Sequence, residues 1–161
     1  MIVERIGARA RRTWTARCHR EEAEVETAAA FGFLDVTPLV AEVVARSGIV
    51  DGLVAVQVLH TTAAIVVNED EPLLLADLRC ALERAAPGGL VYRHDDLAAR
   101  PGVPADEPAN GHAHCKALFL RASETLAVAG GRLRLGRWQR VFLVELDGPR
   151  TRALSLTVLG A

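Results

Sequence analysis

The stretch "VQVLHTTAAIVVNEDEP", residues 56–72, most constrains the fold of this chain. Two apolar runs rich in β-branched residues are separated by a histidine and two threonines at 60–62, and the second run ends at Asn68 and Glu69. Such runs are typical of buried β-strands. We expect either a hairpin or one long strand with a bulge at the threonines, with polar side chains at both ends.

Composition narrows the class of protein. The chain has 161 residues, half of them apolar, which suits a single domain over 1–161 with one proper core. Nineteen basic residues against twenty acidic ones give a net charge of −1, which argues against non-specific binding to nucleic acid or to an anionic membrane. No apolar run is long enough to span a membrane, and no apolar segment follows the basic residues of the N-terminus. We expect a cytoplasmic protein.

The three cysteines, Cys18, Cys80 and Cys115, are odd in number, far apart and without a CxxC pair. A disulfide framework or a structural zinc knuckle is therefore not expected. Each is interpreted as a small buried hydrophobe in a reducing cytoplasm.

Local signals predict three helices. Thr37 is a suitable cap with Pro38 at the first helical position, and Gly48 ends that helix. A second helix begins at Asp70 or Glu71 and ends at "PGG", residues 87–89. A short third helix follows a possible cap at Asn110.

The remaining segments predict strands and one long loop. Residues 11–29 indicate two short, half-exposed strands. Residues 92–110 contain three prolines and no period, which indicates a long loop of the kind that is usually functional. From residue 125 to the end we predict a β-meander with turns at "AGGR" and "DGPR". The pattern indicates an α+β domain dominated by antiparallel strands.

The histidines are the strongest candidates for functional residues among the polar side chains. Neutral imidazole is the commonest metal ligand, and three imidazoles that leave one position open would make a catalytic metal site. His60 ends a strand, and His94 lies in the long loop. His112 and His114 open the third helix two residues apart, so only one of them should face a given site. A single strand-end histidine is more often a hydrogen-bonded core residue, and that alternative stays open.

The stretches "GFLDVTPLVAEVVARSGIVDGLVAVQVLHTTAAIVVNEDEP", "YRHDD", "NGHAHCKALFLRASET" and "GGRLRLGRWQRVFLVELDGPRTR" resemble the YjbQ-type family, described as secondary thiamine-phosphate synthases. The resemblance runs from about Phe31 to the end. It implies an α+β fold with a mostly antiparallel, β-sandwich or barrel-like core and two to three flanking helices. It also implies a homotrimer.

The resemblance assigns the site residues. It implies a metal site at His60, His94 and His114, a catalytic group of Thr61, Asn68 and Glu69, and substrate-binding residues Asn110, Lys116, Ser123, Arg132 and Gln139. The chain departs from the family pattern at Arg137 and Arg140, where the family usually has a threonine and a small residue. These two arginines indicate a change of substrate preference if they line the pocket.

The implied reaction joins a pyrimidine methyl diphosphate to a thiazole phosphate and expels pyrophosphate. The implied partner is thus a small phosphorylated metabolite, and the implied cofactor is a divalent metal ion. Histidine ligands suit zinc or another transition metal better than magnesium. Two alternatives stay open, namely a metal-dependent hydrolase of a small phosphorylated or cyclic substrate, and a non-enzymatic trimer that binds a metal or metabolite.

The length of the second apolar run limits how its two ends can cooperate. A strand of six residues spans about 20 Å, so His60 and Glu69 meet only if the chain folds back or a neighbouring subunit supplies one of them. We therefore predict a site at or near a subunit interface.

Overall fold

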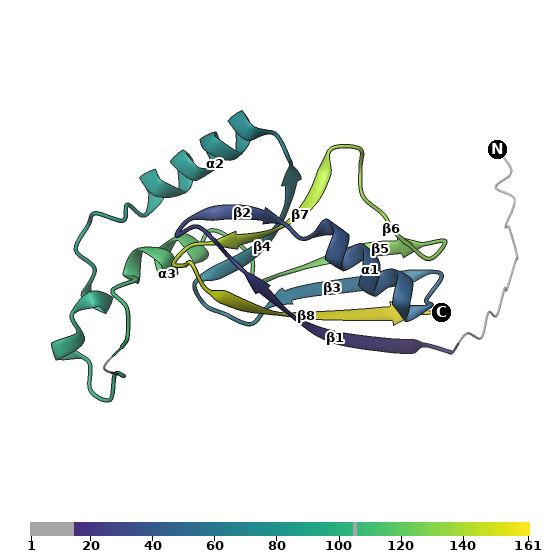
Figure 1. Cartoon of the computed structure of the whole chain (residues 1–161), viewed down its shortest axis with the longest axis horizontal. Coiled ribbons are helices and arrows are strands. Elements are labelled where there is room, and N and C mark those ends of the chain that lie inside the picture. Colours follow the sequence, from purple (N-terminus) through teal and green to yellow (C-terminus); the bar gives the residue numbers. More distant parts are fainter. Residues whose placement is uncertain (1–14, 105) are drawn as a thin grey trace, which may run out of the picture.

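Figure 1 shows the computed structural model of the chain, which describes residues 15–104 and 106–161. Two antiparallel sheets form a sandwich. The five-stranded sheet has the order β1-β8-β3-β5-β6, and the three-stranded sheet has the order β2-β7-β4. The strands are β1 (Arg17–Glu26), β2 (Gly32–Asp35), β3 (Gly52–Val58), β4 (Ala63–Glu69), β5 (Ser123–Ala129), β6 (Arg132–Leu133), β7 (Gln139–Glu145) and β8 (Thr151–Gly160).

Three α-helices lie outside the strands in the described part of the chain, which confirms the α+β class. They are α1 (Thr37–Ser47), α2 (Pro72–Ala85) and α3 (Gly111–Ala117), and the loop before α3 holds two 3₁₀ turns, η1 (Arg93–Asp95) and η2 (Leu97–Ala99). Helices α2 and α3 lie at the three-stranded sheet, and α1 packs over the five-stranded sheet, in contact with β6, β8 and β7 (Figure 1). None of the described helices is long and apolar enough to cross a membrane.

Strand β7 shows where the cores lie. Successive side chains of a strand point to opposite faces. Val141 and Leu143 pack into the main core with α1 and the five-stranded sheet, whereas Phe142 and Val144 pack into a second, smaller core. Because both faces of β7 are covered, its apolar run is continuous rather than alternating.

Helix α2 is the most loosely packed of the three α-helices. None of its residues is fully buried. Leu75 and Leu82 reach the second core, while Leu73 is largely exposed. The helix therefore leaves much of its surface without a partner within the described chain.

Both expectations for residues 56–69 are wrong. Strand β3 pairs with β5 and β8, whereas β4 pairs with β7 in the other sheet. The chain crosses from one sheet to the other at residues 60–62. The predicted meander is wrong for the same reason, because β7 and β8 belong to different sheets although β5 and β6 do form a hairpin.

The predictions of the helix ends are confirmed at Gly48 and Glu71 and wrong at Thr37. Gly48 ends α1 in the left-handed region at φ 63°, and Glu71 caps α2 through the Leu73 and Leu74 amides, as predicted. Thr37 is not the cap, because Asp35 accepts its amide hydrogen and Val36 is the cap residue. Asn110 stands at the α3 cap position without a capping hydrogen bond.

At the N-terminal end of the described chain, residues 17–26 form one ten-residue strand rather than two short ones. Residues 11–14 of that prediction lie outside the described residues. The ten-residue pairing of β1 with β8 explains the single strand.

The prediction that the cysteines are buried is also wrong. Cys18, Cys80 and Cys115 are exposed free thiols. Cys18 lies on β1 at the edge of the five-stranded sheet, and Cys80 lies on the loosely packed α2, so neither position has a covering layer.

Gly52 tests the register between β3 and β8. A methyl group on Gly52 would lie 2.1 Å from the Leu159 carbonyl oxygen. We expect Gly52→Ala to lower the free energy of unfolding by about 1–3 kcal/mol, because backbone rather than a flexible side chain must move. Gly89→Ala is the control, since no atom lies within 4 Å of the added carbon. Equal urea midpoints for the two variants would contradict the register.

Candidate functional site

A buried ion pair forms the floor of the candidate site. Glu145 ends β7 and Arg152 lies near the start of β8, and each is only 2% exposed. Arg152 Nε donates to Glu145 Oε2 at 2.7 Å, and Arg152 Nη2 donates to Glu145 Oε1 and to Thr62 Oγ1. The pair thus joins the two sheets at the point where the chain crosses between them.

The Glu145 carboxylate also holds the β7–β8 turn. Its Oε1 accepts the amide hydrogens of Leu146, Asp147 and Gly148 at 3.0, 2.9 and 2.7 Å. Its Oε2 accepts the Thr27 hydroxyl at 2.8 Å. Burial alone would raise the pKa of Glu145, but the hydrogen bonds from Arg152, the Asp147 amide and Thr27 outweigh it and lower the pKa to about 2.

A cavity of about 340 Å³ lies over this ion pair. The β3–β4 crossing, the loop before α3, α3 itself and the β7–β8 turn enclose it. Its lining includes His60, Thr61, Thr62, Glu107, Asn110, His114, Asp147, Arg150 and Arg152. We call it the histidine cavity.

His60 extends the β3–β8 ladder with its side chain. Leu59 N–H donates to the Ala153 carbonyl at 2.9 Å, and Ala153 N–H donates to His60 Nε2 at 2.9 Å. Because Nε2 accepts a hydrogen bond, the neutral ring carries its proton on Nδ1. Burial, followed by the charge of Arg152, lowers the pKa of His60. His60 is therefore neutral at pH 7 and offers Nδ1 to the cavity.

His114 lines the same cavity, and His94, which does not itself line it, packs against the His114 ring. Their ring centroids are 4.6 Å apart, edge to face. Asp95 Oδ1 accepts the Gly111 amide hydrogen at 2.7 Å, which ties η1 to the start of α3 and brings the two rings together. Burial, followed by the nearby His94, lowers the pKa of His114. His94 Nε2 is buried and has no hydrogen-bond partner among the described residues.

These nitrogens fit a transition metal in part. An unpartnered buried ring nitrogen beside a second imidazole is a suitable donor pair. The third predicted ligand, His60, already uses Nε2 for Ala153. Within residues 15–104 and 106–161 no group of three or more His, Cys, Asp or Glu side chains is gathered tightly enough to hold an ion.

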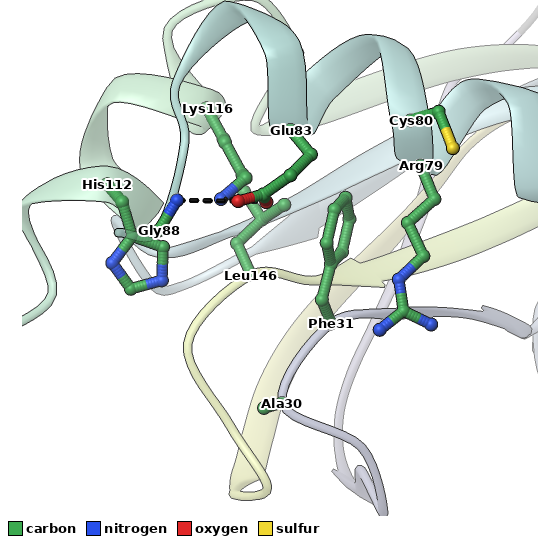
Figure 2. A pocket seen from close by; sticks show the side chains of 9 residues that line it. All are labelled: Ala30, Phe31, Arg79, Cys80, Glu83, Gly88, His112, Lys116 and Leu146. Carbon is green, nitrogen blue, oxygen red and sulfur yellow. Dashed lines mark hydrogen bonds and ion pairs between the residues drawn. The ribbon is translucent and has the colours of Figure 1, made fainter. Parts of the chain in front are cut away.

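His112 and His114 point to different cavities, as their spacing predicts. His114 lines the histidine cavity, whereas His112 lines a second cavity beside Glu83 and Lys116 (Figure 2). Lys116, a predicted substrate-binding residue, therefore lies outside the histidine cavity. Its ammonium pairs with Glu83 at 2.9 Å.

Asn110 is the one predicted substrate-binding residue that lines the histidine cavity. Its Nδ2 donates to Asp147 Oδ2 at 2.8 Å, and Asp147 also pairs with Arg150 at 2.9 Å. Asn110 Oδ1 is buried without a partner among the described residues. The side chain is held in place with one acceptor unused.

The other predicted site residues lie elsewhere in the single chain. Glu69 and Asn68 end β4 beside Gln139 and Arg140 of β7, at the opposite end of the three-stranded sheet from Ala63. Arg132 pairs with Ala129, near the start of β3, whereas Ser123 pairs with Gln57, near its end. None of Asn68, Glu69, Ser123, Arg132 and Gln139 lines the histidine cavity.

Sequence reasoning missed the residues that shape the floor. Glu145 and Arg152 stand in "VELDGPRTR", where the pattern indicates only a turn. A signal was present, because a glutamate at the end of a run as apolar as "VFLV" requires a buried partner. Arg152 follows it by seven residues.

Comparison with known proteins identifies the family to which this chain belongs. The family model described as UPF0047 protein YjbQ-like matches residues 21–161. A UPF0047 protein of Archaeoglobus fulgidus is 38% identical over 86% of this chain and 99% of its own, and one of Methanothermobacter thermautotrophicus is 34% identical over 88% and 92%. The chain belongs to the YjbQ-like UPF0047 family.

Solved structures agree with the fold. A YbjQ-like protein of unknown function from Sulfolobus solfataricus superposes with a TM-score of 0.81 at 35% identity, covering 91% of this chain and 100% of that one. A hypothetical protein from Aeropyrum pernix superposes with a TM-score of 0.78 at 38% identity, covering 89% and 99%. The expected YjbQ-like sandwich is thereby confirmed.

The ion pair makes a prediction about pH. The pKa of Glu145 is lowered from 4.5 to about 2, so its stabilisation is complete above pH 4.5 and is lost as the pH falls towards 2. At neutral pH we expect Glu145→Gln to cost about 3–5 kcal/mol, because it leaves Arg152 buried without a counter-ion. Urea unfolding measured at a series of pH values should show that the difference in free energy of unfolding between wild type and variant becomes smaller in acid.

Glu124→Gln is the control, since Glu124 pairs with the exposed Arg121 at 3.6 Å. Its cost should stay below about 1 kcal/mol at every pH. A gap for Glu145→Gln that is the same in acid as at neutral pH would contradict the assigned role of the pair.

Proposed function

We propose that the protein is a thiamine-phosphate-synthase-like transferase, which joins a pyrimidine methyl diphosphate to a thiazole phosphate and releases pyrophosphate. The proposal rests on the family's described activity and on one observation. His94 Nε2 is buried without a partner among the described residues, and its ring packs against that of His114, which lines a polar cavity. A buried donor or acceptor left unpaired costs free energy, which favours a ligand there.

His94 and His114 would hold a divalent metal ion. His60 would join them only if Ala153 released its Nε2, because the proton on Nδ1 leaves that nitrogen without a free lone pair. Zinc or another transition metal suits these nitrogens better than magnesium. When bound, the ion supplies stabilisation for negative charge on a departing pyrophosphate.

The chain's own residues would bind and orient the substrate. Arg150 is 39% exposed at the cavity and offers donors to phosphate oxygens, although it shares its charge with Asp147. Arg152 is committed to Glu145 and Thr62, so it acts as a wall and a fixed positive charge. Thr61 and the Nδ1–H of the neutral His60 add hydrogen-bond donors.

We propose further that the protein is a homotrimer in which Asn68 and Glu69 of one subunit complete the histidine cavity of another. The support is their position at the opposite end of the three-stranded sheet from the crossing at residues 60–62. Helix α2, with no fully buried residue, and the exposed Leu118 and Phe119 after α3 leave apolar surface for such contacts. Exposed free thiols at Cys18, Cys80 and Cys115 suit a reducing cytoplasm.

A metal-dependent hydrolase is the second candidate. Glu107 and Asp147 line the histidine cavity within one chain, so a carboxylate is available to a water molecule without Glu69. The product separates the two enzymes, since a hydrolase releases an uncoupled alcohol or phosphate. Absence of any turnover would instead favour a trimer that only binds a metal or metabolite.

Turnover tests the proposal directly. Wild-type protein incubated with the pyrimidine diphosphate, the thiazole phosphate and a panel of divalent metals should form thiamine phosphate. His114→Ala should reduce the rate by about 100-fold or more, because it removes a proposed ligand. His112→Ala, which changes a histidine of the second cavity, should keep the wild-type rate. Thiamine phosphate formed equally by all three proteins, or by none, would contradict the proposal.

Mixing inactive variants tests the composite site. Glu69→Gln and His114→Ala should each be inactive alone as homotrimers. Co-expressed at equal amounts, they should recover roughly a quarter of the wild-type activity, because about one interface in four then combines an intact Glu69 with an intact His114. No recovery from trimers shown to contain both variants would place the whole site within one subunit.

A further inference from the structure

A second cavity, distinct from the histidine cavity, lies between α2, α3 and the segment before β2 (Figure 2). Its volume is about 400 Å³, within the range of small-molecule sites. Phe31 and Leu146 supply an apolar wall, and Arg79, Glu83, His112 and Lys116 supply the polar groups. We call it the Phe31 cavity.

Lys116 is the unusual residue of this cavity. It is only 1% exposed, and its ammonium group lies 2.9 Å from Glu83 Oε2. In the described part of the chain, Glu83 is its only polar partner within hydrogen-bond or ion-pair distance. An ammonium has three donors, and a buried charge needs them satisfied. Two donors thus remain for a ligand.

Glu83 is held as an acceptor beside that ammonium. Its Oε1 accepts the Gly88 amide hydrogen at 2.6 Å. The hydrogen bond from Lys116, followed by that from Gly88, lowers the pKa of Glu83, which keeps it ionised at neutral pH. One end of the cavity therefore presents a donor and an acceptor side by side, which suits a hydroxyl group that accepts from Lys116 and donates to Glu83.

Arg79 marks the other end. Its guanidinium carbon lies 5.3 Å from the Phe31 ring centroid, and the Lys116 ammonium lies 5.4 Å from the same centroid. Figure 2 shows the two cations on opposite sides of the ring. Arg79 is exposed and has no carboxylate within 4.0 Å among the described residues. A free guanidinium is suited to bind a carboxylate.

We propose that the Phe31 cavity binds a small aromatic carboxylate that carries a hydroxyl group across the ring from its carboxylate. The carboxylate would lie at Arg79, the ring against Phe31 and Leu146, and the hydroxyl between Lys116 and Glu83. Apart from His112, the two cations and one carboxylate of the lining leave one positive charge, which matches a monoanion. The binding is independent of the proposed transferase chemistry, which uses the histidine cavity.

Titration with 4-hydroxybenzoate, followed by amide chemical shifts in two-dimensional NMR, tests the proposal. Wild-type protein should show saturable shifts at residues of the cavity, such as Gly88 and Leu146. Arg79→Gln and Lys116→Met should each weaken binding by about 10-fold or more, since each removes a hydrogen bond to a charged group. Benzoate, without the hydroxyl, and 4-hydroxybenzyl alcohol, without the carboxylate, should bind more weakly than the parent compound.

Two control variants keep the test specific. Arg84→Gln changes an exposed arginine of α2 that does not line the cavity, and His114→Ala changes the histidine cavity. Both should bind 4-hydroxybenzoate as the wild type does, whether or not the protein has transferase activity. Absence of saturable shifts at millimolar ligand would overturn the proposal, as would binding that Arg79→Gln leaves unchanged. Because Arg79 is exposed, that variant remains informative even if Lys116→Met does not fold.

Discussion

The buried ion pair between Glu145 and Arg152 is the interaction on which this sandwich depends at its functional end. It joins the last residue of β7 in one sheet to β8 in the other, and the same carboxylate holds the turn between them. Arg152 also binds Thr62, where the chain returns to the three-stranded sheet. An ion pair buried this fully is stable only if its remaining hydrogen-bond donors and acceptors have partners. Here three backbone amides and two hydroxyl groups supply them.

The histidine cavity follows from that constraint. Because the chain must cross between sheets beside Arg152, His60 leaves the end of β3 and its ring takes the ladder position facing Ala153. The opposing wall is built separately, through the hydrogen bond from the Gly111 amide to Asp95 that brings His94 to His114. The hydrogen bond between Ala153 and His60 joins residues 93 apart in the sequence, and the one between Gly111 and Asp95 joins residues 16 apart. Together they place His60 and His114 on one cavity, with His94 beside His114.

Some features of this arrangement could be predicted from the sequence. They are the ones caused by contacts between residues that are close together in the chain. Gly48 and Glu71 delimit helices through contacts within a few residues, so their roles were predictable. The division of strands between sheets was not, because β3 and β4 have similar apolar patterns and the pattern does not specify a partner strand. The family resemblance indicated the sandwich and the histidines, but Glu145 was hidden within an apolar run. The helical spacing correctly separated His112 from His114, and the same spacing argument, applied to Lys116, would have questioned its place in the histidine cavity.

The central claim is that His94 and His114 form a metal centre, and calorimetric titration with Zn²⁺ or Co²⁺ tests it most directly. The account predicts that wild-type protein binds one ion per chain and that the double variant His94→Ala, His114→Ala loses this binding while remaining folded. His112→Ala should bind as the wild type does. Equal binding by the wild type and the folded double variant, or no binding by the wild type, would contradict the account.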